Sequence, residues 1–112
     1  MLLTPFVATS TDEATVAFVE KYKEKTGGDI PNQFAADGYD VVMALYQACT
    51  EAGITADMSA SDVCDALKAV FTSEDFSVDG LTGAGMTWDA SGAVSKAPHG
   101  MVIENGEYQP MD

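Results

Sequence analysis

The segment from Ile30 to Gly53 contains the longest run of periodic apolar residues in this chain. Apolar side chains recur there at steps of three and four, which places one set of them on a single helix face: Tyr39, Val42, Met43, Tyr46 and Cys49. Further apolar residues widen that face, so we expect a central helix over about 34–52 that is covered on more than one side. Gly53 can adopt the left-handed conformation that ends a helix.

A second helix is expected before the central one. Ser10 followed by Glu13 forms a capping box, with Ser10 as the cap, and predicts a helix over about 11–26. Lysines gather toward its end, where cations suit the helix dipole. The pair Gly27-Gly28 is expected to stop it.

A third helix is expected after the central one. Ser59, with Asp62 three residues later, predicts a start at the cap and a helix over about 59–73. Its apolar residues share one face: Val63, Leu67, Val70 and Phe71. That face is expected to pack against the rest of the chain.

Short strands are predicted in the last third of the chain and extended structure at its beginning. Residues 1–9 are apolar and contain a proline, which favours an extended segment. Turn signals bound apolar runs at about 85–89, 100–104 and 107–109, and Asn105-Gly106 is typical of a tight hairpin turn. Three helices followed by short antiparallel strands indicate an α/β chain.

Composition limits the classes of protein and partner. The chain has 112 residues, of which 46% are apolar, so it can form one domain with a core and is not a disordered chain. The formal net charge of −13 would repel nucleic acid and anionic membranes, and we interpret it as favouring solubility. No segment has the length of a membrane span. Cys49 and Cys64 are expected to be buried free thiols, with a disulfide between neighbouring helices as the alternative.

No group of residues indicates catalysis. His99 lies in the loop Pro98-His99-Gly100 without a serine, cysteine or carboxylate in a recognisable arrangement, which is typical of a surface histidine. Asp37 and Asp40 are three residues apart on the central helix and could form a carboxylate pair, but we expect Asp40 to face solvent. The chain is therefore predicted not to be an enzyme.

Metal and cofactor motifs are incomplete. The segment Asp89-Ala90-Ser91-Gly92 begins like a calcium loop but lacks the later carboxylates and the closing glutamate, so we predict a plain turn. The glycines near residues 80–85 do not form a phosphate loop because no helix follows them. We expect no metal and no cofactor.

Several motifs, in order, resemble one family over nearly the whole chain. Residues 18–25 resemble an F-x-x-x-Y helix, and residues 31–41, PNQFAADGYDV, resemble P-x-x-x-A-A-x-x-Y-D-A. Residues 48–53 resemble A-x-x-x-A-G, residues 81–92 resemble G-x-T-G-x-x-x-F-D-x-x-G, and residues 102–108 resemble a closing strand and turn. The family is that of the type I periplasmic binding proteins, the extracellular receptors of branched-chain amino acid ABC transporters.

This resemblance implies a fold and a position within it. Trp88 replaces a usual phenylalanine and Val41 a usual alanine. Family members are much longer and have two lobes, so residues 1–112 resemble one partial domain, the C-terminal third of such a receptor. The implied fold class is a fragment of the type I periplasmic-binding-protein fold.

The resemblance also implies ligand contacts. In the family, the ligand lies between the lobes, and the loop that enters the central helix lines that cleft. Phe34 is expected to pack on the ligand side chain, with sealing of the helix start as the alternative. Asp37 could meet a ligand ammonium, or lie at the surface, and Tyr39 could contact the ligand or pack within the lobe. The expected ligand-binding residues are therefore Phe34, Asp37 and Tyr39.

Two functions from different classes follow. The first is a fragment of an extracellular or periplasmic receptor, held at the membrane through a missing N-terminal region, which captures an amino acid by lobe closure and delivers it to an ABC permease. The fragment alone would bind weakly or not at all. The alternative is a small assembly domain without a ligand, in which uncovered helix faces and strand edges make a homo-oligomer.

Overall fold

The computed structural model describes residues 1–111, and across them the chain forms three helices and five strands. The order of these elements confirms the α/β prediction. The elements are β1 (Leu2–Thr4), α1 (Glu13–Thr26), α2 (Gln33–Glu51), α3 (Ala60–Phe71), β2 (Val78–Gly80), β3 (Gly83–Met86), β4 (His99–Glu104) and β5 (Glu107–Pro110).

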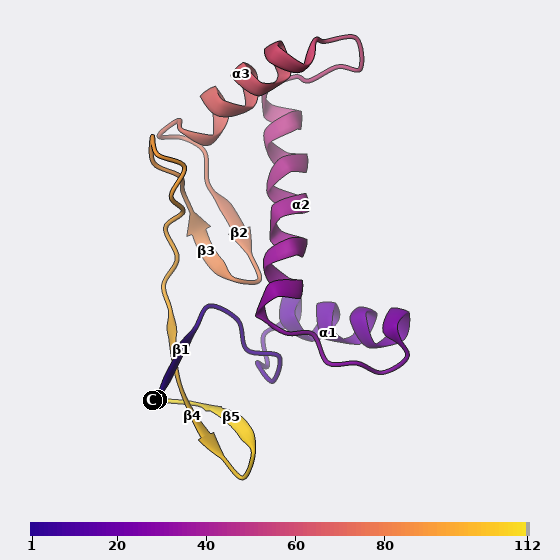
Figure 1. Ribbon diagram of the computed structural model, residues 1–112, viewed down its shortest axis with the longest axis vertical. Coiled ribbons are helices and arrows are strands. Elements are labelled where there is room, and N and C mark those ends of the chain that lie inside the picture. Colours follow the sequence, from indigo (N-terminus) through magenta and orange to yellow (C-terminus); the bar gives the residue numbers. More distant parts are fainter. Residues whose placement is uncertain (112) are drawn as a thin grey trace.

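The molecule is elongated, with extents of 52 × 31 × 20 Å. Figure 1 shows α2 along the long axis, with the β2–β3 hairpin beside it and α3 across one end. Helix α1 and the sheet formed by β1, β4 and β5 lie toward the other end. No helix in the described residues is long and apolar enough to cross a membrane.

The helices lie close to the predicted ranges, but the cap of α1 differs from the prediction. Asp12, not Ser10, is the cap: Asp12 Oδ1 accepts a hydrogen bond of 2.9 Å from the Thr15 amide. Ser10 instead donates its hydroxyl to Asp12 Oδ2 at 2.6 Å. A carboxylate at this position also interacts favourably with the helix dipole, which explains why it displaces the serine. Gly27 ends α1 with a φ of 80°, as predicted.

Helix α2 begins and ends as the sequence indicates. The side chain of Asn32 caps its first turn by accepting a hydrogen bond of 3.0 Å from the Ala35 amide. Gly53 follows the C-cap residue Ala52 and has a φ of 63°, which confirms its predicted left-handed conformation.

Two antiparallel sheets form from the five strands. One has the order β1-β4-β5, in which Leu2 pairs with Met101, and the other consists of β2 and β3. The β4–β5 hairpin turns at Asn105 and Gly106, both with positive φ, as predicted from this dipeptide. β2 lies in a segment, residues 76–83, whose composition is typical of turns.

The predicted strand over 85–89 is wrong in its position. The pairing of β3 with β2 ends at Met86, because the chain then turns toward residues 93–95. Ser95 donates its amide to the Thr87 carbonyl at 2.9 Å, and Trp88 makes a single bridge with Val94. The turn predicted at residues 89–92 lies within this loop: the Gly92 amide donates to the Asp89 carbonyl at 2.9 Å.

Two separate apolar cores hold the elements together. The first joins α2, α3 and the β2–β3 hairpin, and its buried members are Ala44, Ala48, Phe76, Val78 and Met86. The predicted apolar face of α3 packs against it through Leu67, Val70 and Phe71. The second core joins α1, the segment after β1 and the start of α2 through Phe6, Val19 and Ala36.

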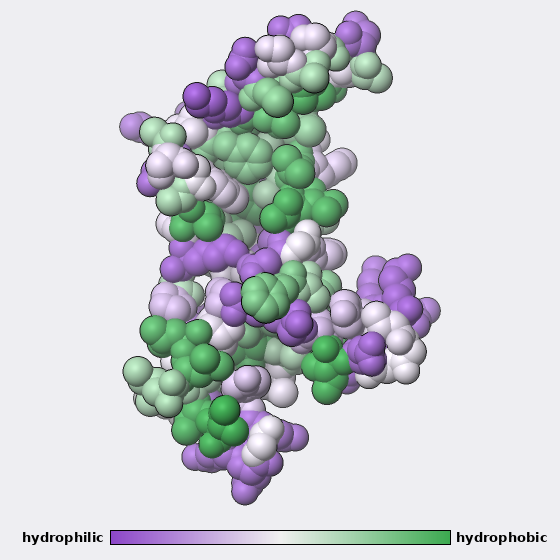
Figure 2. All heavy atoms as spheres, in the orientation of Figure 1, coloured by the Kyte–Doolittle hydropathy of each residue, from purple (hydrophilic) through white to green (hydrophobic). Residues whose placement is uncertain are grey.

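The expectation that α2 is covered on more than one side is wrong for the described residues. Its buried positions are Ala36, Asp40, Ala44 and Ala48, at steps of four. The larger apolar side chains predicted to be buried are exposed instead, with 64% of Val42 and 71% of Tyr46 accessible. Small residues allow the hairpin and α3 to approach α2 closely, and no described segment covers the opposite face. Figure 2 shows apolar side chains at the surface along this region and near the sheet.

The cysteines are both free, as predicted, but only one is sheltered. Cys49 is half-buried on α2 and Cys64 is exposed on α3. The prediction that both thiols are buried is therefore wrong for Cys64, which lies near the start of α3.

Candidate functional site

The three residues predicted to bind ligand lie in the first turns of α2 but do not converge. Phe34 is 77% exposed, and Tyr39 is exposed on another side of the helix, where its ring lies 5.1 Å from that of Phe18. Asp37 is half-buried and faces Lys96. The structure therefore separates an exposed aromatic, an aromatic in a packing contact and a paired carboxylate.

Phe34 borders a groove of about 420 Å³. The groove lies between β1, the segment after it, the turn before α2 and the start of β5, and apolar residues dominate its lining. They include Leu2, Leu3, Phe6, Val7, Ala8, Ile30, Pro31 and Phe34. Asn32, Gln33 and Glu107 add polar groups at its border. Such a surface suits the apolar part of a small ligand, with polar groups nearby to orient it.

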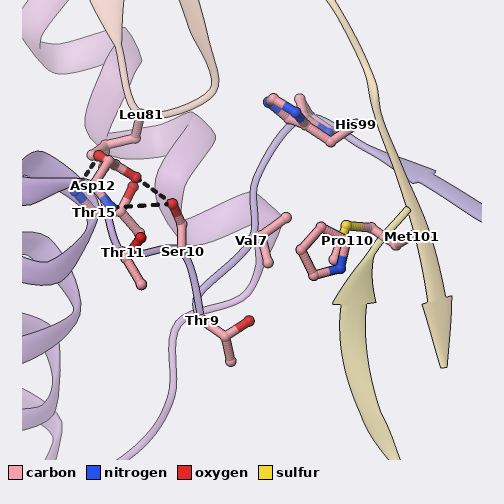
Figure 3. Close-up of a pocket in the computed structure, with 11 residues that line it drawn as sticks. Val7, Thr9, Ser10, Thr11, Asp12, Thr15, Leu81, His99, Met101 and Pro110 are labelled. Atoms are coloured by element: carbon pink, nitrogen blue, oxygen red, sulfur yellow. Dashed lines mark hydrogen bonds between the residues drawn. The ribbon is translucent and has the colours of Figure 1, made fainter. Parts of the chain in front are cut away.

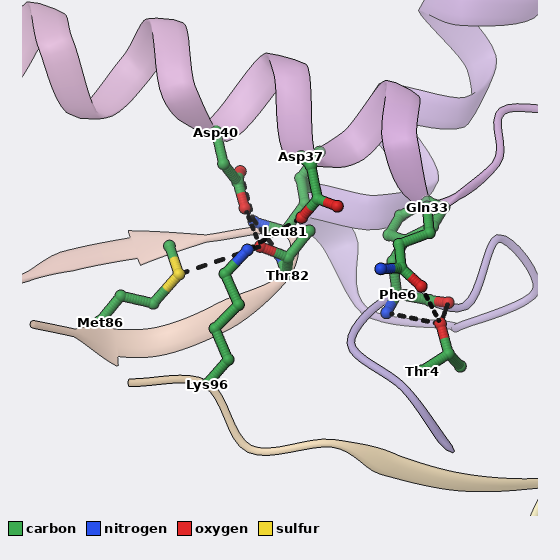
Figure 4. Close-up of polar contacts among 9 residues, drawn as sticks. All are labelled: Thr4, Phe6, Gln33, Asp37, Asp40, Leu81, Thr82, Met86 and Lys96. Carbon is green, nitrogen blue, oxygen red and sulfur yellow. Dashed lines mark hydrogen bonds and ion pairs between the residues drawn. The ribbon is translucent and has the colours of Figure 1, made fainter. Parts of the chain in front are cut away.

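Asp40 is buried, so the prediction that it faces solvent is wrong. It is only 4% exposed, and its carboxylate accepts hydrogen bonds from the amides of Leu81 and Thr82, both at 2.8 Å. The Thr82 hydroxyl donates a third at 2.6 Å (Figure 4). The turn between β2 and β3 directs these donors at the carboxylate, and charge-assisted hydrogen bonds of this kind compensate for its burial.

Lys96 joins Asp37 to this buried carboxylate. Its ammonium donates to Asp37 Oδ1 at 2.9 Å and to Thr82 Oγ1 at 2.7 Å, and the same hydroxyl donates its proton to Asp40. Asp37 and Asp40 therefore each have their own partners and do not act as a free carboxylate pair. Figure 4 shows the four side chains meeting between α2 and the hairpin.

Sequence reasoning missed Thr82 and Lys96 as members of this site. One signal was available for Asp40, which lies in step with Ala36, Ala44 and Ala48 on a row of small residues. An ionisable residue in such a row indicates a buried carboxylate that needs donors. The identity of the donors, more than forty positions away, is not encoded locally.

A second cavity, of about 460 Å³, lies between the start of α1, the Leu81 turn and β4 (Figure 3). Its polar wall is the cap of α1. The hydrogen bond from the Ser10 hydroxyl, followed by that from Thr15, lowers the pKa of Asp12 below its usual range. These groups cap helix α1, so the polar wall of this cavity has a structural role. His99, the first residue of β4, also lines this cavity.

The plain turn predicted at residues 89–92 is present and is held by a local hydrogen-bond network. The Asp89 carboxylate accepts hydrogen bonds from the Ser91 amide at 2.8 Å, the Ser91 hydroxyl at 2.6 Å and the Ala93 amide at 3.0 Å. The Ser91 hydroxyl is the main cause of the lowered pKa of Asp89. Within residues 1–111, no group of three or more histidine, cysteine or acidic residues is placed to hold a metal ion.

Comparison with known proteins gives one family and two similar structures. The family model described as "Periplasmic binding protein" matches residues 1–105. A structure from Rhodospirillum rubrum, assigned as a branched-chain amino acid ABC transporter, is 29% identical with a TM-score of 0.71, and the match covers 98% of this chain and 30% of that one. The leucine binding protein LivK from Thermotoga maritima is 24% identical with a TM-score of 0.61, over 93% and 27% of the two chains, and so shows a shared fold. No curated protein matches the sequence.

Proposed function

Because this chain belongs to the periplasmic binding protein family, we propose that it supplies part of a receptor that captures an amino acid outside the cytoplasm. The ligand would be a branched-chain or similar amino acid, enclosed by the closure of two lobes and passed to an ABC permease. The role is non-covalent binding rather than catalysis. The chain spans 30% and 27% of the two similar structures, so the activity of the whole receptor is part of the proposal.

The observation that carries this proposal is the uncharged, exposed face of α2. The chain has a net charge of −13, yet residues 41–50 contain no charged side chain. Their exposed apolar members are Val41, Val42, Met43, Leu45 and Tyr46. A contiguous apolar face of this kind is typical of a surface that another part of a protein covers. We propose that the rest of the receptor lobe covers it.

The ligand-facing wall is proposed at the start of α2. Phe34 is exposed beside the apolar groove, which supports a contact with the apolar side chain of the ligand. Asp37 is proposed to bind the ligand ammonium, which would have to displace Lys96 from the Asp37 carboxylate. Tyr39 is proposed as an outer contact, because its ring also packs on Phe18. One wall cannot enclose a ligand, so we expect weak binding by this chain alone.

Nuclear magnetic resonance titration of the 112-residue chain with leucine tests the ligand assignment. We expect shift changes at millimolar ligand that centre on Phe34 and Asp37 and disappear in Phe34→Ala. Glutamate is the matched ligand control, because its charged side chain does not suit an apolar groove. The ligand assignment would be contradicted if leucine and glutamate produced the same changes, or if leucine produced the same changes in Phe34→Ala.

Self-association is a second candidate function, supported by the same face of α2 and by the sheet. In the order β1-β4-β5, the outer strands β1 and β5 each have one side without a partner strand among the described residues. Such edges can pair with a second copy. Light scattering after size exclusion should show a dimer that Val42→Lys with Tyr46→Lys disrupts and Val16→Lys on α1 does not. A dimer whose mass does not change when leucine is added would favour self-association over the receptor function.

A further inference from the structure

Three polar side chains on one face of α2 each contact a different segment of the chain. They are Gln33, Asp37 and Asp40, spaced four and three residues apart, which places them in a row along the helix. Gln33 Oε1 lies 3.2 Å from Thr4 Oγ1 at the end of β1, while Asp37 binds Lys96 and Asp40 binds the turn at Thr82. Figure 4 shows all three contacts along the same helix.

We propose that this row, which we name the α2 clamp, sets the position of the β1-β4-β5 sheet, with Lys96 as its releasable contact. The sheet is joined to the rest of the molecule by two segments, 5–12 and 87–98 (Figure 1). Gln33 contacts Thr4, the last residue of β1 before the first segment, and Asp37 binds Lys96 within the second, close to the start of β4.

The contacts of the clamp differ in their burial. Thr82 is fully buried and Asp40 nearly so, and two backbone amides fix the carboxylate. The side chains of Lys96 and Asp37 are 25% and 31% exposed, so water can replace either partner. The Lys96 contact can therefore open while the hairpin remains bound to α2.

Opening of the contact between Lys96 and Asp37 would link ligand capture to movement of the sheet. An ammonium group that reached Asp37 would compete with Lys96 for the same carboxylate. Displaced from Asp37, Lys96 would keep only its contact with Thr82, so residues 96–98 would be held less firmly while Trp88 stays packed against the first core. The sheet, whose strand β5 borders the groove at Tyr108, could then shift relative to Phe34. This link to capture rests on the proposed function, whereas the attachment through Lys96 is tested without any ligand.

The test measures the distance between α3 and the sheet by double electron–electron resonance between two spin labels. Spin labels are placed on Cys64, which is exposed, and on Gln109→Cys in β5, in a Cys49→Ala background diluted with unlabelled protein. We expect a narrow distance distribution in the background, a broadened and shifted one in Lys96→Met, and a narrow one in Lys96→Arg. Lys23→Met, at an exposed position of α1, also removes one positive charge and should leave the distance distribution unchanged.

A second variant covers the case in which Lys96→Met fails to fold. Asp37→Asn keeps the size of the side chain and removes its charge, so it should also broaden the distribution. The inference is overturned if the folded variants at Lys96 and Asp37 give the background distribution, or if Lys23→Met broadens it equally. Because no ligand is present, this result is separate from a failure of leucine to bind.

Discussion

The hydroxyl of Thr82 donates a 2.6 Å hydrogen bond to the carboxylate of Asp40, a residue 42 positions earlier in the sequence. The same hydroxyl accepts a hydrogen bond from Lys96 at 2.7 Å. This one side chain therefore connects the middle of α2, the turn of the β2–β3 hairpin and the segment that leads to β4. Both Asp40 and Thr82 are buried, so the connection belongs to the interior of the molecule.

Replacement of Asp40 by alanine should lower the free energy of unfolding by about 3 kcal/mol, because two amides and a buried hydroxyl lose their acceptor. Urea denaturation followed by circular dichroism measures this change. Asp65→Ala, at an exposed position of α3, is the matched control and should change the free energy by less than about 0.5 kcal/mol. Equal effects of the two substitutions would contradict the role of Asp40.

Replacement of Gly80 by alanine should lower the free energy of unfolding by about 2 kcal/mol. A Cβ atom there would lie 2.6 Å from the Asp40 carboxyl carbon, so the hairpin would have to move away from α2. Gly38→Ala is the control, because a Cβ at that helical position meets nothing within 4 Å. It should instead raise stability by about 0.5–1 kcal/mol, since alanine favours the helix. Destabilisation by Gly38→Ala would show that this reading of the two glycines is wrong.

The cap of α1 should contribute stability that depends on pH. The pKa of Asp12 is lowered from its usual 3.8 in the folded protein, chiefly by the Ser10 hydroxyl. A lowered carboxyl pKa means that its contribution is complete above the unfolded pKa and is lost as pH falls through the folded value. Asp12→Ala should therefore cost about 1 kcal/mol near neutral pH, and this difference from the unmodified chain should shrink below about pH 4.

Denaturation curves of both proteins from pH 7 to pH 2.5 provide the measurement. Asp29→Ala, in the exposed turn before α2, controls for the general effect of removing a negative charge. A difference between Asp12→Ala and the unmodified chain that stays constant across this range would contradict the charged cap.

Added salt should raise the thermal midpoint of unfolding. The net charge of −13 makes the compact state repel itself, and at about 0.5 M sodium chloride the screening length falls to roughly 4 Å. Sodium chloride and potassium chloride should act equally, because screening depends on ionic strength. A midpoint that falls with either salt would mean that ion pairs such as Lys96–Asp37 outweigh the repulsion.

Local patterns in the sequence determined the helices and the hairpin turn. Cap residues and periodic apolar residues predicted the ranges of the three helices, and glycines after the last turn predicted the ends of α1 and α2, because these signals act between residues a few positions apart. Asn105-Gly106 predicted the β4–β5 turn because both residues accept positive φ. The ordered motifs also indicated the family, which the match over residues 1–105 confirms.

Tertiary structure alone decided which face of α2 is buried and what its carboxylates contact. Apolar periodicity favoured the face that contains Val42 and Tyr46, but the hairpin packs on the row of small residues around Asp40 because close approach needs little side-chain volume. The partners of Asp40 and Asp37 come from Thr82 and Lys96, which are distant in sequence. Such contacts depend on how the chain returns to the helix, and no local spacing of residues specifies that path.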